Sequence, residues 1–200
     1  MRLFFALWPA PAVAERLAGV ARAVASRFGG KPARQESIHL TLAFLGDLPD
    51  EALPALTQAA QTIASAAFTL AIDRLGYWPR KQLLWAAERS PNAELVKLAC
   101  DLETALSRAG FALAGRDPVF SPHITLVRGF PVAGEALMQS AIAAINWPCS
   151  RFALIRSQKS ATGSSYEAAA EFPLNGPAAA WLGPGPGEQN QSGSRGESGA

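Results

Sequence analysis

The feature that most constrains the fold of this chain is a short motif that occurs twice. His39-Leu40-Thr41-Leu42 and His123-Ile124-Thr125-Leu126 share the pattern His, aliphatic, Thr, Leu, and they contain the only two histidines among 200 residues. Chance agreement at both the Thr and the Leu position has odds of roughly one in tens of thousands. We therefore interpret the pair as an internal repeat, in which one half of the domain duplicates the other.

Each copy of the motif reads as part of a β-strand. Side chains two residues apart on a strand share a face, so His39 and Thr41 point one way while their aliphatic neighbours point the other way. The same alternation groups His123 with Thr125. If a pseudo-twofold axis relates the two strands, these four side chains face each other across one cleft.

Such a cleft suits a phosphodiester. One neutral imidazole can take a proton from an attacking water, and one imidazolium can give a proton to the leaving oxygen. The two threonine hydroxyls can donate hydrogen bonds to nonbridging phosphoryl oxygens. Arg128 can add a fixed positive charge there, but strict alternation puts it on the face opposite His123, so it needs a bulge or the strand end to reach the site.

Composition favours one domain. The hydrophobic content of 49% can fill a core, and we expect a domain over residues 1–174 with two lobes, each carrying one motif. Residues 175–200 are rich in Gly, Pro and Ser and predict a disordered tail. The net charge of +2 does not suit a protein that grips long nucleic acid. We expect a monomer.

The termini and cysteines indicate a cytoplasmic protein. Cys100 and Cys149 lie in no paired spacing, which predicts neither a disulfide framework nor a zinc site. The N-terminus has too short an apolar run, followed by Pro and Glu, for a secretory signal peptide. No stretch reaches the roughly 18 apolar residues of a membrane helix.

Apolar periodicity predicts a mixed order of strands and helices. Strands are expected near residues 3–7, 37–45, 68–75, 83–88, 119–127, 150–158 and 165–172, and helices near 12–28, 50–66, 91–109 and 135–145.

Known metal and cofactor patterns are missing. The sequence has no HxH, no HExxH, no acidic cluster beside either histidine and no nucleotide-binding glycine loop, so we expect neither a metal nor a cofactor. Most aromatic residues in so apolar a chain belong to the core. Phe5 and Trp85 are the two candidates for stacking on a nucleobase.

With its HLTL and SPHITLVR segments and the opening strand RLFFAL, the chain resembles the two-histidine (2H) phosphoesterase superfamily. Within it, the likeness is to the RNA 2',3'-cyclic phosphodiesterases, also called LigT-like or 2'-5' RNA ligase-like proteins. The resemblance implies an α+β, bilobal, pseudo-twofold fold in which two antiparallel β-sheets form a central cleft with helices on the outside.

The resemblance also implies an activity. Its members open 2',3'-cyclic phosphate RNA ends to 2'-phosphates without metal, and some join tRNA halves through a reversible 2'-5' bond. Carried over by position, His39 is the proton donor, His123 is the proton acceptor, and Thr41, Thr125 and Arg128 bind the substrate.

Two alternatives stay open. The same residues would serve a phosphodiesterase of small cyclic nucleotides, such as ADP-ribose 1'',2''-cyclic phosphate, or of 2'-5' oligonucleotides. The chain could instead be a nucleotide-binding or RNA-binding module without turnover. Comparing activity on a panel of substrates distinguishes the small-nucleotide phosphodiesterase from an RNA phosphodiesterase. Histidine variants that lose turnover but keep binding distinguish an enzyme from a binding module.

Overall fold

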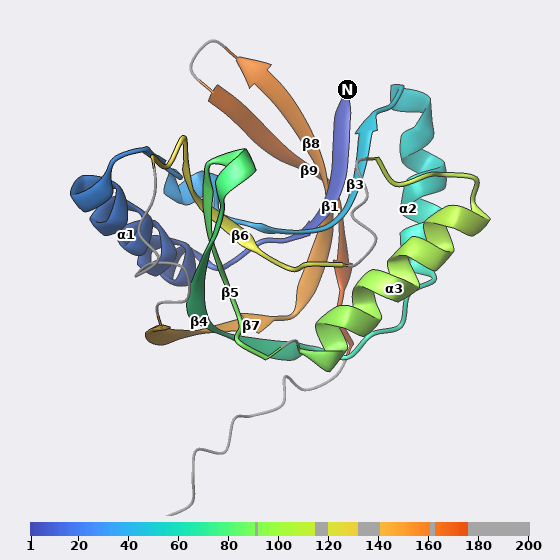
Figure 1. Ribbon diagram of the computed structural model, residues 1–200. Coiled ribbons are helices and arrows are strands. Elements are labelled where there is room, and N and C mark those ends of the chain that lie inside the picture. The colour runs from blue at the N-terminus through green and yellow to red at the C-terminus, as the bar shows by residue number, and fades with distance from the viewer. Residues whose placement is uncertain (91, 115–119, 132–140, 161–162, 176–200) are drawn as a thin grey trace, which may run out of the picture.

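A single antiparallel sheet organises the computed structural model, which describes residues 1–90, 92–114, 120–131, 141–160 and 163–175 (Figure 1). Its strand order is β7-β4-β5-β6-β3-β1-β8-β9, with β2 paired to β6. The strands are β1 (Arg2–Leu7), β2 (Lys31–Pro32), β3 (Leu40–Asp47), β4 (Phe68–Trp78), β5 (Leu83–Ala87), β6 (Ile124–Arg128), β7 (Ala141–Cys149), β8 (Arg151–Ser160) and β9 (Gly163–Pro173).

The helices are amphipathic and bury one face on this sheet. They are α1 (Pro11–Phe28), α2 (Leu53–Gln61) and α3 (Ala93–Arg108), with short 3-10 turns η1 (Gln35–Ser37), η2 (Asp50–Ala52) and η3 (Pro79–Lys81). Proline at the first position starts α1, and Gly29, with φ 90°, ends it. Asn92 caps α3 by accepting a hydrogen bond from the Leu95 N–H, 3.1 Å away.

The chain repeats a strand, helix, strand unit, and the helix of each unit, α1 in the first and α3 in the second, packs on strands of the other unit's half of the sheet. Helix α1 follows β1 but contacts β6 and β7, whereas α3 follows β5 but contacts β3. Figure 1 shows α1 on one side of the molecule and α2 with α3 on the other. Because of this exchange, apolar side chains from both halves lie in one large core cluster.

The expected α+β class is confirmed, with two refinements. The two sheets expected from the resemblance are joined, because β3 pairs with β6 at Leu40 and Ile124. The expected helix near residues 135–145 is contradicted from Ala141 onward, where β7 begins. Ile145, Trp147 and Cys149 are buried while Asn146 and Pro148 are exposed, which is the two-residue alternation of a strand paired with β4.

Other boundaries moved by a few residues. The helix expected over residues 50–66 is the short turn η2 followed by α2, which ends at Gln61. The domain end expected at residue 174 falls at the close of the described range, and the tail from 176 onward lies outside it. Among the described residues, none of the helices has the length and apolar character needed to cross a membrane.

Candidate active site

The two histidine motifs meet at the centre of the sheet. Leu40 of β3 pairs with Ile124 of β6 in an antiparallel register. In that register the next residues are also opposite each other, so Thr41 lies across from His123 and His39 lies across from Thr125. The four side chains that the sequence grouped are therefore brought together on one face of two adjacent strands, crosswise.

The same backbone bond orients both imidazole rings. Nδ1 of His39 donates to the carbonyl oxygen of Ser37 at 2.8 Å, and Nδ1 of His123 donates to the carbonyl oxygen of Ser121 at 2.9 Å. A carbonyl oxygen only accepts, so each Nδ1 carries the hydrogen. Nε2 is then the nitrogen through which each ring exchanges a proton.

Aromatic rings enclose His39. Trp8 stacks on it with ring centroids 5.0 Å apart and 7° between the planes. Phe4 lies 5.1 Å away and Tyr166, from β9, lies 5.4 Å away. Arg34 holds the β8–β9 hairpin beside the motif by donating to the Ser164 carbonyl oxygen at 3.2 Å.

This enclosure changes the charge state of His39. The pKa of His39 is lowered from 6.5 to about 4. Loss of hydration is the largest cause, the bond to Ser37 opposes it, and the charges of Arg128 and His123 add to the lowering. His39 is therefore neutral at pH 7 in the free protein.

The ring of His123 lies against a different set of side chains. Trp78 meets its ring edge-on at 4.4 Å and an angle of 73°. Lys81 lies over Trp78 at 4.8 Å, and Arg74 lies over the neighbouring indole of Trp85 at 5.2 Å. Cations therefore flank this half, whereas aromatic rings flank His39.

A bulge turns Arg128 toward the histidines. β5 pairs Leu84 with Val127 but Trp85 with Thr125, which leaves Leu126 as an extra residue in β6. Leu126 and Val127 are both buried, and the alternation shifts so that Arg128 shares the face of Thr125. The effect of its charge on His39 agrees with this placement.

The two candidates for stacking on a base are placed differently. Trp85 pairs with Thr125 and lies on the cleft face. Phe5 is fully buried, 0% exposed, against Phe152 and Phe172 in the main core. The structure corrects the expectation for Phe5. Side chains alternate along β1, so Phe4 and Ala6 lie on the cleft face of this strand and Phe5 lies on the opposite face.

Sequence reasoning missed two groups around the histidines. The repeat begins two residues earlier than expected, since Ser37 and Ser121 hold equivalent positions and their carbonyls orient the rings. Comparing the segments SIHLTL and SPHITL would have found them. Tyr166 gave no such signal, because only the fold brings β9 next to His39.

Comparisons with known proteins show which family the chain belongs to. The family model "LigT like Phosphoesterase" matches residues 7–85. An RNA 2',3'-cyclic phosphodiesterase from Thermus thermophilus is 31% identical over 94% of this chain and 98% of that protein. The chain belongs to the LigT-like phosphoesterase family. A second relative of the same name, from Escherichia coli, is 39% identical, and its match spans about half of each protein, 50% of this chain and 55% of the relative.

Solved structures of the family share the fold. A structure of Escherichia coli LigT complexed with 3'-AMP has a TM-score of 0.75 at 30% identity and covers 86% of this chain and 97% of that one. The Thermus thermophilus protein TT0787 has a TM-score of 0.75 at 29% identity, over 88% of this chain and all of that chain. As a LigT-like phosphoesterase, this chain is a phosphodiesterase enzyme.

Proposed function

We propose that this LigT-like protein hydrolyses the 2',3'-cyclic phosphate at RNA ends to a 2'-phosphate by metal-independent acid and base catalysis. The observation that carries the proposal is the crosswise pair of His-x-Thr motifs, each with its imidazole oriented by the same backbone bond. Relatives named RNA 2',3'-cyclic phosphodiesterase support the choice of substrate.

The reaction needs one proton acceptor and one proton donor. A water oxygen attacks phosphorus while Nε2 of His123 removes a proton from that water. The bond from phosphorus to O3' breaks, and Nε2 of His39 gives O3' its proton. The phosphate stays on O2'. Thr41, Thr125 and Arg128 stabilise the charge that develops on the nonbridging oxygens.

His39 must gain a proton before it can donate one. Its pKa of about 4 leaves it neutral in the free protein. An anionic phosphate beside the ring favours imidazolium and raises this pKa, so His39 becomes charged when the substrate binds. The environment that lowers the pKa also makes His39 a strong acid once water is excluded.

Histidine NMR tests the assignment of roles, because the chain has only two histidines and gives two sets of imidazole signals. We expect the His39 signals to titrate at low pH in the free protein and to move to the charged form when a 2'-nucleotide product binds. If His39 stays neutral with product bound while His123 is charged, the roles are reversed.

The proposed reaction itself is tested with a short RNA that ends in a 2',3'-cyclic phosphate, incubated with excess chelator. We expect a 2'-phosphate, with one oxygen from solvent in ¹⁸O-water, and loss of product in His39→Ala and His123→Ala. A 3'-phosphate product, or activity that chelator removes, contradicts the mechanism. If the 5'-hydroxyl of a second RNA replaces water, the same steps form a 2'-5' bond, so joining of RNA halves is assayed alongside.

Small cyclic nucleotides are the second substrate class. The net charge of only +2 gives little long-range attraction for a polyanion. A panel of nucleoside 2',3'-cyclic phosphates and ADP-ribose 1'',2''-cyclic phosphate, compared with RNA by kcat/KM, decides between the classes.

A further inference from the structure

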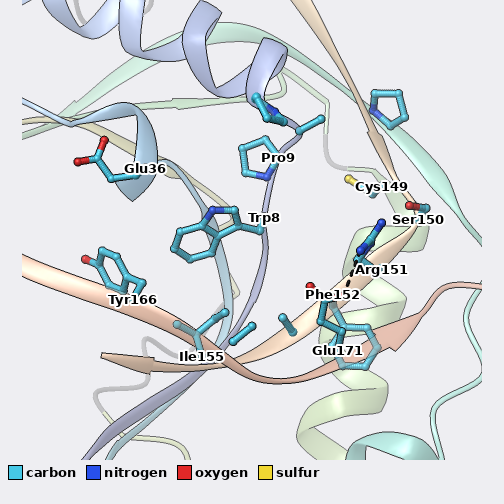
Figure 2. Close-up of a pocket in the computed structure, with 15 residues that line it drawn as sticks. Trp8, Pro9, Glu36, Cys149, Ser150, Arg151, Phe152, Ile155, Tyr166 and Glu171 are labelled. Carbon is cyan, nitrogen blue, oxygen red and sulfur yellow. Dashed lines mark hydrogen bonds and ion pairs between the residues drawn. The ribbon is translucent and has the colours of Figure 1, made fainter. Parts of the chain in front are cut away.

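Positive charge is distributed unequally between the two halves of the molecule. Beside the first motif, Arg34 bonds to Glu36, with Nε and Oε1 3.2 Å apart, and Arg151 bonds to Glu171, with Nη1 and Oε2 3.0 Å apart. Figure 2 shows the second pair, joined by a dashed line, in the pocket that Trp8 also lines. Two cations of this half are therefore neutralised by carboxylates.

The surroundings of the second motif differ. Residues 27–31, 75–87 and 120–131 meet at β6 and contain no Asp or Glu. Their exposed cationic side chains, which we call the basic strip, are those of Arg27, Lys31, Arg80, Lys81 and Arg128. Within the described part of the chain, no carboxylate forms an ion pair with Arg27, Lys31, Arg80 or Arg128. The strip therefore keeps its positive charge.

The short strand β2 places one cation of the strip at the cleft. Lys31 lies opposite Arg128 in the antiparallel register of β2 and β6, so the two side chains share one face. Gly30, with φ 92°, allows this close approach, because a Cβ there would lie 2.6 Å from Cγ1 of Val127. Since the bulge in β6 turns Arg128 toward the histidines, Lys31 continues the positive charge outward from the site.

The turn η3 brings two more cations to the same end of β6. The N–H of Phe130 donates to the carbonyl oxygen of Gln82 at 2.9 Å, which holds this turn beside the strand. Lys81 of the turn lies over Trp78 at 4.8 Å, and that indole meets the ring of His123 at 4.4 Å. The basic strip therefore begins beside the second histidine.

An exposed aromatic ring lies at the far end of the strip. Phe28, the last residue of α1, is 40% exposed and is the only exposed large hydrophobic side chain among the described residues. Arg27 lies over its ring at 5.0 Å, and Phe130 meets it edge-on at 6.3 Å. Surfaces that bind single-stranded nucleic acid combine cations that follow the backbone with aromatic rings on which bases stack.

Resting on the function proposed above, we infer that the basic strip and Phe28 bind the RNA strand upstream of the cyclic phosphate. The cations contact the phosphates of the preceding nucleotides, and Phe28 stacks with one of their bases. Charge complementarity selects a polyanion, and Arg128 joins the strip to the catalytic site. The protein then distinguishes an RNA end from a mononucleotide, although its net charge is only +2, because the charge near the second motif is not offset by carboxylates of the same segments.

The test compares 2',3'-cyclic AMP with a short RNA that has the same 3' end. Lys31→Gln and Arg80→Gln should each lower kcat/KM for the RNA about 5-fold at 0.1 M salt, the effect of one lost phosphate contact on a single strand. The value for cyclic AMP should change far less, because a mononucleotide does not reach the strip. Arg108→Gln removes an exposed cation from α3 and is the matched control, which should change neither value.

Salt dependence separates phosphate contacts from stacking. Binding of an RNA that ends in a 2'-phosphate, followed by fluorescence anisotropy, should weaken with salt, and Lys31→Gln should make the logarithmic slope less steep by about 0.7. Phe28→Leu removes the flat ring and should weaken binding about 5-fold without changing the slope, because stacking involves no counterions. Phe28→Trp keeps an aromatic face and should bind at least as well as the wild type.

These measurements separate this inference from the proposed reaction. Equal losses on RNA and cyclic AMP, or a salt slope that no strip variant changes, overturn the inference and keep the function. The expected binding pattern without any turnover removes the function and keeps the strip. Binding of anionic phosphatidylserine vesicles in place of the RNA assigns the strip to a membrane surface and also overturns the inference.

Discussion

The two halves of the cleft carry the same motif in different surroundings. In each copy a serine lies two residues before the histidine, and its carbonyl oxygen accepts a hydrogen bond from Nδ1 of the ring. A β-strand begins directly after the histidine, and a threonine lies two residues after it. His39 is enclosed by Phe4, Trp8 and Tyr166, whereas the ring of His123 meets the indole of Trp78, over which Lys81 lies. The motif thus fixes the orientation of each ring, and the surroundings of His39 lower the pKa of that ring.

This difference matters because acid and base catalysis need two histidines in opposite states. Two equal imidazoles at one pH would hold the same average charge. Enclosure lowers the pKa of His39, so the repeated motif provides the geometry and the neighbours of one copy provide the asymmetry.

The largest expected effect comes from removing either ring. His39→Ala and His123→Ala should each lower kcat about 10²- to 10⁴-fold, the usual contribution of one positioned acid or base. Because the two rings act on one transition state, the double variant should lose little more than either single one. Steady-state kinetics on the cyclic phosphate RNA measures all three.

A reactive leaving group sharpens the comparison. The 4-nitrophenolate ion leaves without a proton, so on bis(4-nitrophenyl) phosphate the variant that lacks the acid should keep more of its activity. We expect that variant to be His39→Ala. Selective retention in His123→Ala would exchange the roles, and no difference between them would show that enclosure does not separate the functions.

The next effect concerns stability below neutral pH. The folded protein holds the pKa of His39 at about 4, against 6.5 when it is hydrated, so the unfolded chain binds more protons between these values. The contribution of His39 to the free energy of unfolding is fully present above pH 6.5 and is lost as the pH falls toward 4. At 1.36 kcal/mol per pKa unit, this loss is about 3 kcal/mol.

Urea unfolding at pH 7 and pH 4.5 measures this loss. His39→Asn has no imidazole at this position and should lose correspondingly less stability over the same interval. Equal acid sensitivity in wild type and His39→Asn would mean that His39 is not enclosed in solution.

A smaller effect is expected on the His123 side. A Cβ at Gly76 would lie 2.1 Å from Cζ2 of Trp85, so Gly76→Ala must displace that indole, at a cost of roughly 1–3 kcal/mol. Trp85 contacts Trp78, which contacts His123, so the NMR signals of His123 should move more than those of His39. Gly19→Ala is the control, since its Cβ meets only Nη2 of Arg22 at 3.9 Å and should stabilise α1.

The sequence predicted what the repeat and local periodicity determine. α1, α3 and β1 lie within about two residues of their expected bounds, and the four motif side chains share a face as expected. Local pattern could not predict contacts between distant segments. β7 is a strand because it pairs with β4, which overrides the helical pattern expected there. Tyr166 reaches His39 across 127 positions of sequence, and no local signal marks that contact.

The smallest effect tests whether the two halves are electrically coupled. Arg128 reaches the site only through the bulge at Leu126, and its charge contributes to the low pKa of His39 after burial, which is the largest cause. Arg128→Gln should therefore raise the pKa of His39 toward its ordinary value without restoring it, whereas Arg128→Lys, which keeps the charge, should change it less. Titration of the His39 NMR signals measures both. An unchanged pKa in Arg128→Gln would mean that the bulge does not direct Arg128 to the histidines, and the enclosure of His39 alone would then account for the difference between the halves.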